Sequence, residues 1–129
     1  MDILERIKQD YERFPLDQSY DLYSDDVRFK DPLTQFQGIK RYREMIDFMS
    51  QWLQDMTLEL YDISRSEDTI LTDWKLSWTT PLPWRPRISI AGNSQLQLNS
   101  QEKIIAHIDT WKCSRWQVLW QHFSAIKSK

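Results

Sequence analysis

The stretch Tyr23-Ser24-Asp25-Asp26-Val27-Arg28-Phe29-Lys30-Asp31-Pro32, followed by Gly38, decides the order of elements in the first half of the chain. Val27 and Phe29 alternate with charged residues, which predicts a short strand. Asp31 precedes a proline, so its backbone is restricted to extended or turn geometry. After Gly38 the apolar residues return every three or four positions, which predicts a helix through about residue 54 with a stripe formed by Ile39, Tyr42, Ile46, Met49 and Trp52/Leu53.

Two helices are predicted before this stretch. Residues 2–14 have helical apolar spacing, and Asp2 followed by Glu5 resembles a capping box with Asp at the cap. Pro15 ends this helix. A second, short helix is predicted over about residues 16–24, with Leu16, Tyr20 and Tyr23 on one side.

From Thr57 onward the pattern has a period of two, which is typical of strands. Residues 57–65 and 69–80 read as two strands, and residues 87–98 and 103–113 as a hairpin. The proline-containing loop 81–86 is expected to be rigid and exposed. A C-terminal helix is predicted from the helical spacing of Trp116, Leu119, Trp120, Phe123 and Ile126.

The composition indicates one domain over residues 1–129, of the α+β class. The sequence has no apolar run long enough to span a bilayer and no signal-peptide layout at its N-terminus, so we expect a cytoplasmic protein without a membrane partner. A net charge of −2 without a basic stripe argues against nucleic acid, and two glycines give no phosphate-binding loop. No metal-ligand spacing is present, and no cofactor is expected.

Two motifs resemble a known superfamily. Residues 23–32 with Gly38 look like the signature Y-x-D-D-x-x-F-x-D-P…G of the nuclear transport factor 2-like (NTF2-like) superfamily, which includes SnoaL-like polyketide cyclases and ketosteroid isomerases. Residues 92–99 and 103–111 resemble its last two strands, ending in H-x-D-x-W. The resemblance covers about the whole chain and is closest to an uncharacterised branch from photosynthetic organisms. It implies a cone-shaped domain with N-terminal helices packed on a curved, mainly antiparallel sheet of four to six strands, and a short C-terminal helix.

The resemblance also implies a pocket. Asp31 matches the general base of the ketosteroid isomerases, and Tyr11 is similar in placement to their oxyanion-hole tyrosine. Their second oxyanion-hole acid falls on Ser94, so the pattern fails there and steroid-isomerase activity is not expected. The predicted pocket set contains eight residues, namely Tyr11, Asp31, Trp74, Trp78, Ser94, His107, Asp109 and Trp111.

Each polar member of this set has a structural alternative. Asp31 is a candidate base, or a turn residue that accepts hydrogen bonds from local amides. His107 and Asp109 share one face of a strand, where they form either an acid/base pair or a polar pair satisfied inside the cone. Trp74 and Trp78 are most simply core residues, and His122 is expected at the surface.

Three functions are compatible with the sequence. The leading interpretation is a binding or interaction module whose cavity takes a small apolar or carbonyl-containing ligand. The second is a cofactor-free enzyme of the isomerase, cyclase or lyase type, in which Asp31 or Asp109 moves a proton with His107 and Tyr11 polarises a carbonyl. The third is a homodimeric scaffold that pairs through the outer face of the sheet, where a partner would partly bury Leu71 and the Trp-containing loop 81–86.

Overall fold

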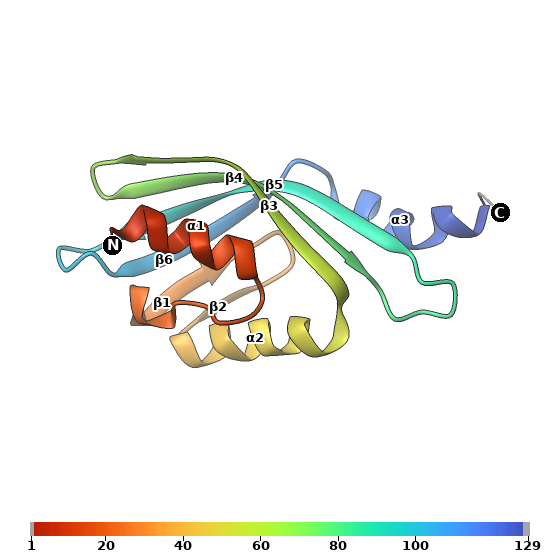
Figure 1. The fold of residues 1–129 in the computed structure, drawn as a ribbon, viewed down its shortest axis with the longest axis horizontal. Helices are drawn as coiled ribbons and strands as arrows, with labels where there is room; N and C mark the ends of the chain where they lie inside the picture. Colours follow the sequence, from red (N-terminus) through yellow and green to blue (C-terminus); the bar gives the residue numbers. More distant parts are fainter. Residues whose placement is uncertain (1, 128–129) are drawn as a thin grey trace.

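The computed structural model describes residues 2–127, with side chains through Phe123. One curved sheet forms the body of the molecule, with two helices under its concave face and a third helix at the far end (Figure 1). In chain order the elements are α1 (Ile3–Arg13), the 3-10 turn η1 (Tyr20–Leu22), β1 (Tyr23–Lys30), β2 (Gln35–Gln37), α2 (Ile39–Trp52), β3 (Gln54–Ser66), β4 (Thr69–Thr79), β5 (Arg87–Leu98), β6 (Ile104–Trp111) and α3 (Arg115–Lys127).

The six strands form one open sheet in the order β2-β1-β6-β5-β4-β3. All neighbours are antiparallel except β1 and β6, which are parallel. This confirms the predicted α+β architecture, including the strand at Val27, the two hairpins and the helix after Gly38. The N-terminal helix is also confirmed, because the Asp2 side chain accepts a 2.9 Å hydrogen bond from the Glu5 amide at its start.

The predicted helix over residues 16–24 is wrong. Only η1 is helical there, and Tyr23 already begins β1. The reason is tertiary: the buried carboxylate of Asp10 accepts hydrogen bonds from the Ser19 amide at 3.1 Å and the Ser19 hydroxyl at 2.8 Å. These bonds tie the connecting segment back to α1 instead of leaving its amides for a helix. The short edge strand β2 was not predicted from the sequence; it pairs with β1, and Phe36 stacks on Phe29.

The strand pairing has four register shifts: one between β1 and β6, two between β3 and β4, and one between β5 and β6. In β3 the partners change from Leu60↔Trp74 to Asp62↔Asp73, so Tyr61 is an extra residue. In β6 they change from Leu98↔Ile104 to Gln97↔Ala106, so Ile105 is extra. Bulges of this kind increase the local twist and reset which face a side chain occupies. The bulge at Ile105 is the reason why both Ile104 and His107 point to the interior.

The proline-containing loop is less exposed than predicted. Pro86 is fully buried, and Trp84 is half-buried with its indole N–H donating to the backbone oxygen of His122 at 2.5 Å. The loop therefore packs against α3. The presence of α3 confirms the predicted C-terminal helix. The side chain of Ile126, part of the predicted stripe, lies outside the described residues. No helix among residues 2–127 is long and apolar enough to cross a membrane.

Candidate functional site

A cavity of about 360 Å³ lies between the concave face of the sheet and the helices. Its wall is mostly apolar, and it extends from Ile7 on α1 to Val118 on α3. All eight residues of the predicted pocket set line it. The structure therefore brings together side chains from α1, from the β1–β2 turn and from the last three strands.

A row of three oxygen-bearing side chains runs across β4, β5 and β6, and two of them, Ser94 and Asp109, line the cavity. Thr72 on β4 pairs with Ser94 on β5, and Ser94 pairs with Asp109 on β6. Residues that oppose each other on neighbouring strands project from the same face of the sheet, so their side chains meet. Tyr11 reaches this row from α1, and its hydroxyl shares a 2.8 Å hydrogen bond with the Thr72 hydroxyl.

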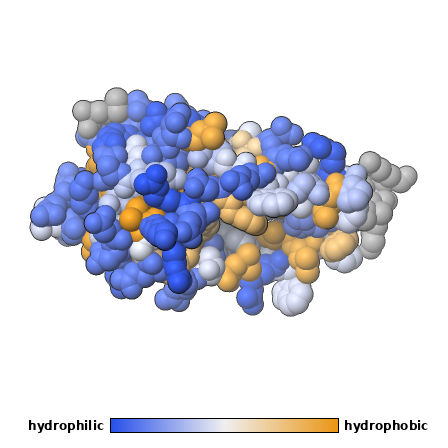
Figure 2. All heavy atoms as spheres, turned by 90° about the horizontal axis from the view of Figure 1, so that it is seen from below, coloured by the Kyte–Doolittle hydropathy of each residue, from blue (hydrophilic) through white to orange (hydrophobic). Residues whose placement is uncertain are grey.

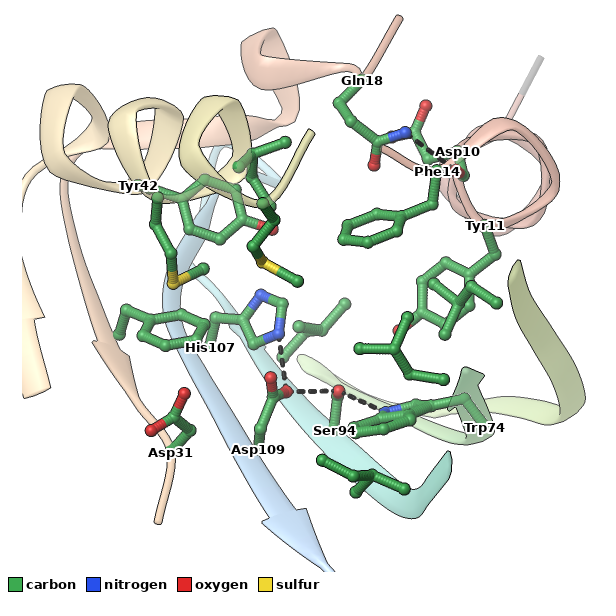
Figure 3. A pocket seen from close by; sticks show the side chains of 18 of the residues that line it. Asp10, Tyr11, Phe14, Gln18, Asp31, Tyr42, Trp74, Ser94, His107 and Asp109 are labelled. Carbon is green, nitrogen blue, oxygen red and sulfur yellow. Dashed lines mark hydrogen bonds and ion pairs between the residues drawn. The ribbon is translucent and has the colours of Figure 1, made fainter. Parts of the chain in front are cut away.

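Asp109 is the centre of the polar network, as Figure 3 shows. Its Oδ1 lies 2.8 Å from Nε2 of His107 and accepts a 2.5 Å hydrogen bond from the Ser94 hydroxyl. Ser94 in turn accepts a 2.8 Å hydrogen bond from the indole N–H of Trp74. On the other side, Nδ1 of His107 is 3.3 Å from the hydroxyl of Tyr23.

The donors in this network can be assigned. A carboxylate only accepts, so His107 carries its proton on Nε2 and, when neutral, accepts at Nδ1 from Tyr23. Tyr42 lies 3.2 Å behind Tyr23, oxygen to oxygen, and completes the series as a donor. Two chains of donors, one from Trp74 and one from Tyr42, thus converge on a single oxygen of Asp109.

The second oxygen of Asp109 is available to a ligand. Among the described residues it has no hydrogen-bond partner, and the same residues contain no side-chain polar atom that is both buried and unsatisfied. It follows that this oxygen keeps accessible surface, and Asp109 is one of the residues that line the cavity. The arrangement holds the Asp109 carboxylate in one orientation and leaves one acceptor facing the open space.

The tyrosines of the cavity remain protonated at neutral pH. Burial raises the pKa of Tyr11 to about 12, and the hydrogen bond with Thr72 opposes that shift. Burial also raises the pKa of Tyr23 and of Tyr42 well above the ordinary value. All three hydroxyls are therefore neutral. Either hydroxyl can donate in the bond between Tyr11 and Thr72, and when Thr72 donates, the Tyr11 proton is left for a ligand oxygen.

Asp31 lies apart from the network in Figure 3. Its Oδ1 accepts hydrogen bonds from the amides of Leu33 at 2.8 Å and Thr34 at 2.7 Å, which is the turn-forming arrangement. Burial raises the pKa of the Asp31 carboxyl, and these two amides oppose the shift. Asp31 borders the cavity, but its contacts are those of the structural alternative.

Gly92 decides where the indole of Trp74 lies. Gly92 faces Trp74 on β4 and Trp111 on β6. A Cβ at this position would be 2.8 Å from Cη2 of Trp74 and 2.6 Å from the Thr110 carbonyl oxygen. Because glycine has no side chain, the Trp74 ring can lie over β5, from where its N–H reaches Ser94.

Several site residues were missed from the sequence. Thr72 shares the face of Ile70 and Trp74, so the period-two pattern could have identified it. Tyr23 and Tyr42 surround the His107 ring together with Phe29; this depends on the parallel pairing of β1 with β6, for which the sequence carries no local signal.

The expectation for His122 was wrong. Its side chain is half-buried, lines the cavity, and makes 3.0 Å hydrogen bonds with the Thr80 hydroxyl and the Val118 carbonyl. Val118 lies one helical turn earlier and also lines the cavity. This spacing could have indicated an inward-facing pair. Among the described residues, no group of three or more His, Cys, Asp or Glu side chains is arranged to hold a metal ion.

Comparisons with solved structures identify proteins that share this fold. An NTF2-like protein of unknown function from Exiguobacterium sp. 255-15 superposes with a TM-score of 0.70 at 19% identity, covering 86% of this chain and 98% of that one. A protein with a ketosteroid isomerase-like fold from Catenulispora acidiphila DSM 44928, in complex with trimethylamine, superposes with a TM-score of 0.74 at 13% identity. The match covers 93% of this chain and 91% of that one. An LEH-like epoxide hydrolase from M. tuberculosis superposes with a TM-score of 0.73 at 10% identity. The match covers 97% of this chain and 90% of that one.

These identities establish a shared fold and no shared activity. The predicted NTF2-like, ketosteroid isomerase-like cone fold is confirmed by these neighbours, whereas the branch from photosynthetic organisms stays a prediction. No curated protein matches the sequence. A family model matches residues 1–107, most of the chain. The chain therefore belongs to the family described as "Uncharacterized conserved protein (DUF2358)", and it has the NTF2-like fold.

Proposed function

We propose that the protein binds a small, mainly apolar molecule that carries one hydrogen-bonding oxygen. The observation that carries this proposal is the converging polar network around Asp109 at the floor of an otherwise apolar cavity. A volume of about 360 Å³ is within the range of small-molecule sites, which combine apolar walls with a few oriented polar groups. The apolar wall would supply affinity, and the polar row would fix the orientation of the ligand.

The ligand oxygen has two complementary partners. A carbonyl or ether oxygen would accept from the Tyr11 hydroxyl, and a hydroxyl group would also donate to the accessible oxygen of Asp109. A purely hydrocarbon ligand would leave these groups without a partner after displacing water from them. We therefore expect a cyclic alcohol or ketone to bind more tightly than the hydrocarbon of the same shape.

Isothermal titration with matched alcohols, ketones and hydrocarbons tests this proposal. The blocking variant is Met49→Trp, because Met49 lines the cavity and a larger side chain would occupy it. The matched control is Phe48→Trp, since Phe48 is 59% exposed and does not line the cavity. The proposal expects binding to be lost in Met49→Trp and kept in Phe48→Trp. Equal affinities for alcohol, ketone and hydrocarbon, or equal effects of the two variants, would contradict it.

A catalytic role is the second candidate, and one observation favours it. Asp109 is oriented by His107 and Ser94 through one oxygen while the other faces the cavity, which is the geometry of a general base. Asp31 is the weaker candidate, because two backbone amides hold its carboxylate. The epoxide hydrolase among the structural neighbours suggests epoxides, alongside ketones, as substrates to screen. Turnover by the wild type that is lost in Asp109→Asn would support catalysis; binding without turnover would exclude it for the compounds tested.

The other expectations from the sequence stay predictions. A homodimer through the outer face of the sheet predicts a solution mass of twice 15.7 kDa. The exposed side chains of Leu71 and Ile108 lie on that face. A single-protomer mass at high concentration would contradict it. The cytoplasmic location is tested by imaging or fractionation of the full chain.

A further inference from the structure

The outward face of α3 is unusual for a helix at the surface of a protein. Trp116, Leu119, Trp120 and Phe123 are 73%, 49%, 58% and 45% exposed. At about 100° per residue these four positions fall within one sector of about 100°, so they form a continuous apolar stripe. A surface helix ordinarily turns such a stripe toward the core. Here Trp116, Leu119 and Trp120 face outward, and Phe123 is partly covered by Trp84, with 6.3 Å between the ring centroids.

The inward face of the same helix belongs to the cavity. Val118 and His122 both line it, and Val118 packs against the cluster that contains Trp74 and Trp78. The helix therefore separates the apolar cavity on one side from the exposed aromatic stripe on the other. In Figure 2 apolar side chains gather on the underside, in the half of the molecule that carries the C-terminus.

The charge of this part of the chain has one sign. Residues 110–129 contain four basic side chains and no acidic one, whereas residues 1–109 contain 13 basic and 19 acidic ones. Arg115 is exposed at the start of α3. Lys112 is paired with Asp73 at 3.3 Å, so it contributes less. The C-terminal segment of an acidic protein thus combines exposed Trp and Leu side chains with unbalanced positive charge.

We propose that α3 docks the protein on the surface of an anionic lipid bilayer. Exposed Trp, Leu and Phe side chains flanked by basic residues are the features of helices that lie in the plane of the membrane interface. Tryptophan favours the headgroup region because its ring is apolar and its N–H is polar. Such a helix lies on the bilayer and does not cross it, so it does not need a helix long and apolar enough to span a membrane, and residues 2–127 contain none. Docking of this kind replaces the expectation that the protein has no membrane partner.

Docking through α3 would bring the cavity next to the bilayer, because Val118 and His122 occupy the other side of the same helix. The docking itself does not depend on the proposed ligand, so the two proposals can fail separately.

Vesicle co-sedimentation of the full chain tests the docking. We expect the wild type to bind phosphatidylcholine vesicles that contain phosphatidylglycerol, to bind pure phosphatidylcholine vesicles more weakly, and to be released partly by added salt. The double substitution Trp116→Ser with Trp120→Ser is expected to lower the partition coefficient at least about tenfold. The matched control is Tyr61→Ser with Leu71→Ser. It removes two side chains that are 61% and 50% exposed on β3 and β4, away from α3, and we expect it to bind like the wild type.

A charge variant keeps the test independent of the tryptophans. Arg115→Glu should weaken binding to the anionic vesicles and leave binding to neutral vesicles unchanged, whereas Arg28→Glu, at an exposed position of β1, should affect neither. Three outcomes would overturn the proposal: no vesicle binding by the wild type, equal loss in the control pair, or a dimer that depends on Trp116 and Trp120 without vesicle binding. The last outcome would assign the stripe to a second copy of the chain.

Discussion

Replacing Gly92 with alanine tests whether the packing of Trp74 is responsible for the polar network. The added Cβ would meet Cη2 of Trp74 at 2.8 Å and Cζ2 at 3.0 Å, and it would also meet the Thr110 carbonyl oxygen at 2.6 Å. All three distances are too short for carbon or oxygen neighbours, so the indole or the β5–β6 pairing must move. Overpacking of this kind costs about 1–3 kcal/mol.

A displaced indole would also lose its hydrogen bond to Ser94, at about 1 kcal/mol. The expected total is a decrease of about 2–4 kcal/mol in the free energy of unfolding. For a domain of this size that corresponds to a fall in Tm of roughly 8–16 °C. Urea denaturation followed by far-UV circular dichroism measures the change without relying on tryptophan fluorescence.

A double-mutant cycle identifies the cause. In a Trp74→Phe background the smaller ring does not extend to the positions of Cη2 and Cζ2, so Gly92→Ala should cost about 1 kcal/mol less there. The contact with the Thr110 oxygen is present in both backgrounds and accounts for the remainder. If Gly92→Ala destabilises both backgrounds equally, the indole does not depend on the missing side chain and the reasoning is wrong.

Three further predictions concern the polar groups. Asp109→Asn removes the acceptor charge shared by His107 and Ser94, so it should weaken binding of an alcohol ligand about tenfold or more in calorimetry while circular dichroism shows a folded protein; unchanged affinity would contradict the site. Asp31→Ala should lower the free energy of unfolding by about 1 kcal/mol, because two backbone amides lose their acceptor, and should leave ligand affinity unchanged. The raised pKa of Tyr11 keeps its proton in the folded state after an unfolded tyrosine has lost it, so stability should be full below pH 10 and decline between pH 10 and about 12. Tyr11→Phe should reduce that decline by up to about 3 kcal/mol in urea titrations at each pH, and an identical decline would refute the assignment.

Local patterns in the sequence were sufficient for most of the fold. Period-two alternation identified β4 and β5, because one face of each strand is buried along its length. Helical spacing and the Asp2 cap identified α1, and the stripe after Gly38 identified α2. Where tertiary contacts override local preference, the sequence misled: the segment before β1 is held by the Asp10 carboxylate and is not helical.

The candidate pocket was predictable for a related reason. His107, Asp109 and Trp111 alternate on one face of a strand, so a single pattern places them together. Only the tertiary structure could decide how they are connected. The register that aligns Thr72, Ser94 and Asp109, the bulge at Ile105 and the parallel pairing that brings Tyr23 to His107 all depend on contacts between distant segments.

The sequence by itself determined the class of fold and most of its elements, because these follow from side-chain periodicity along single strands and helices. The eight residues that line one cavity came from the resemblance to the superfamily, which periodicity supports only for the positions that alternate on a strand. The tertiary structure decided which partners each of the two carboxylates has. It gave Asp31 two amide partners in a turn and left one oxygen of Asp109 open to the cavity. It also turned the aromatic stripe of α3 outward, since the inner positions of that helix are taken by Val118 and His122 against the cavity. Both outcomes depend on packing between elements far apart in the chain, which no local pattern records.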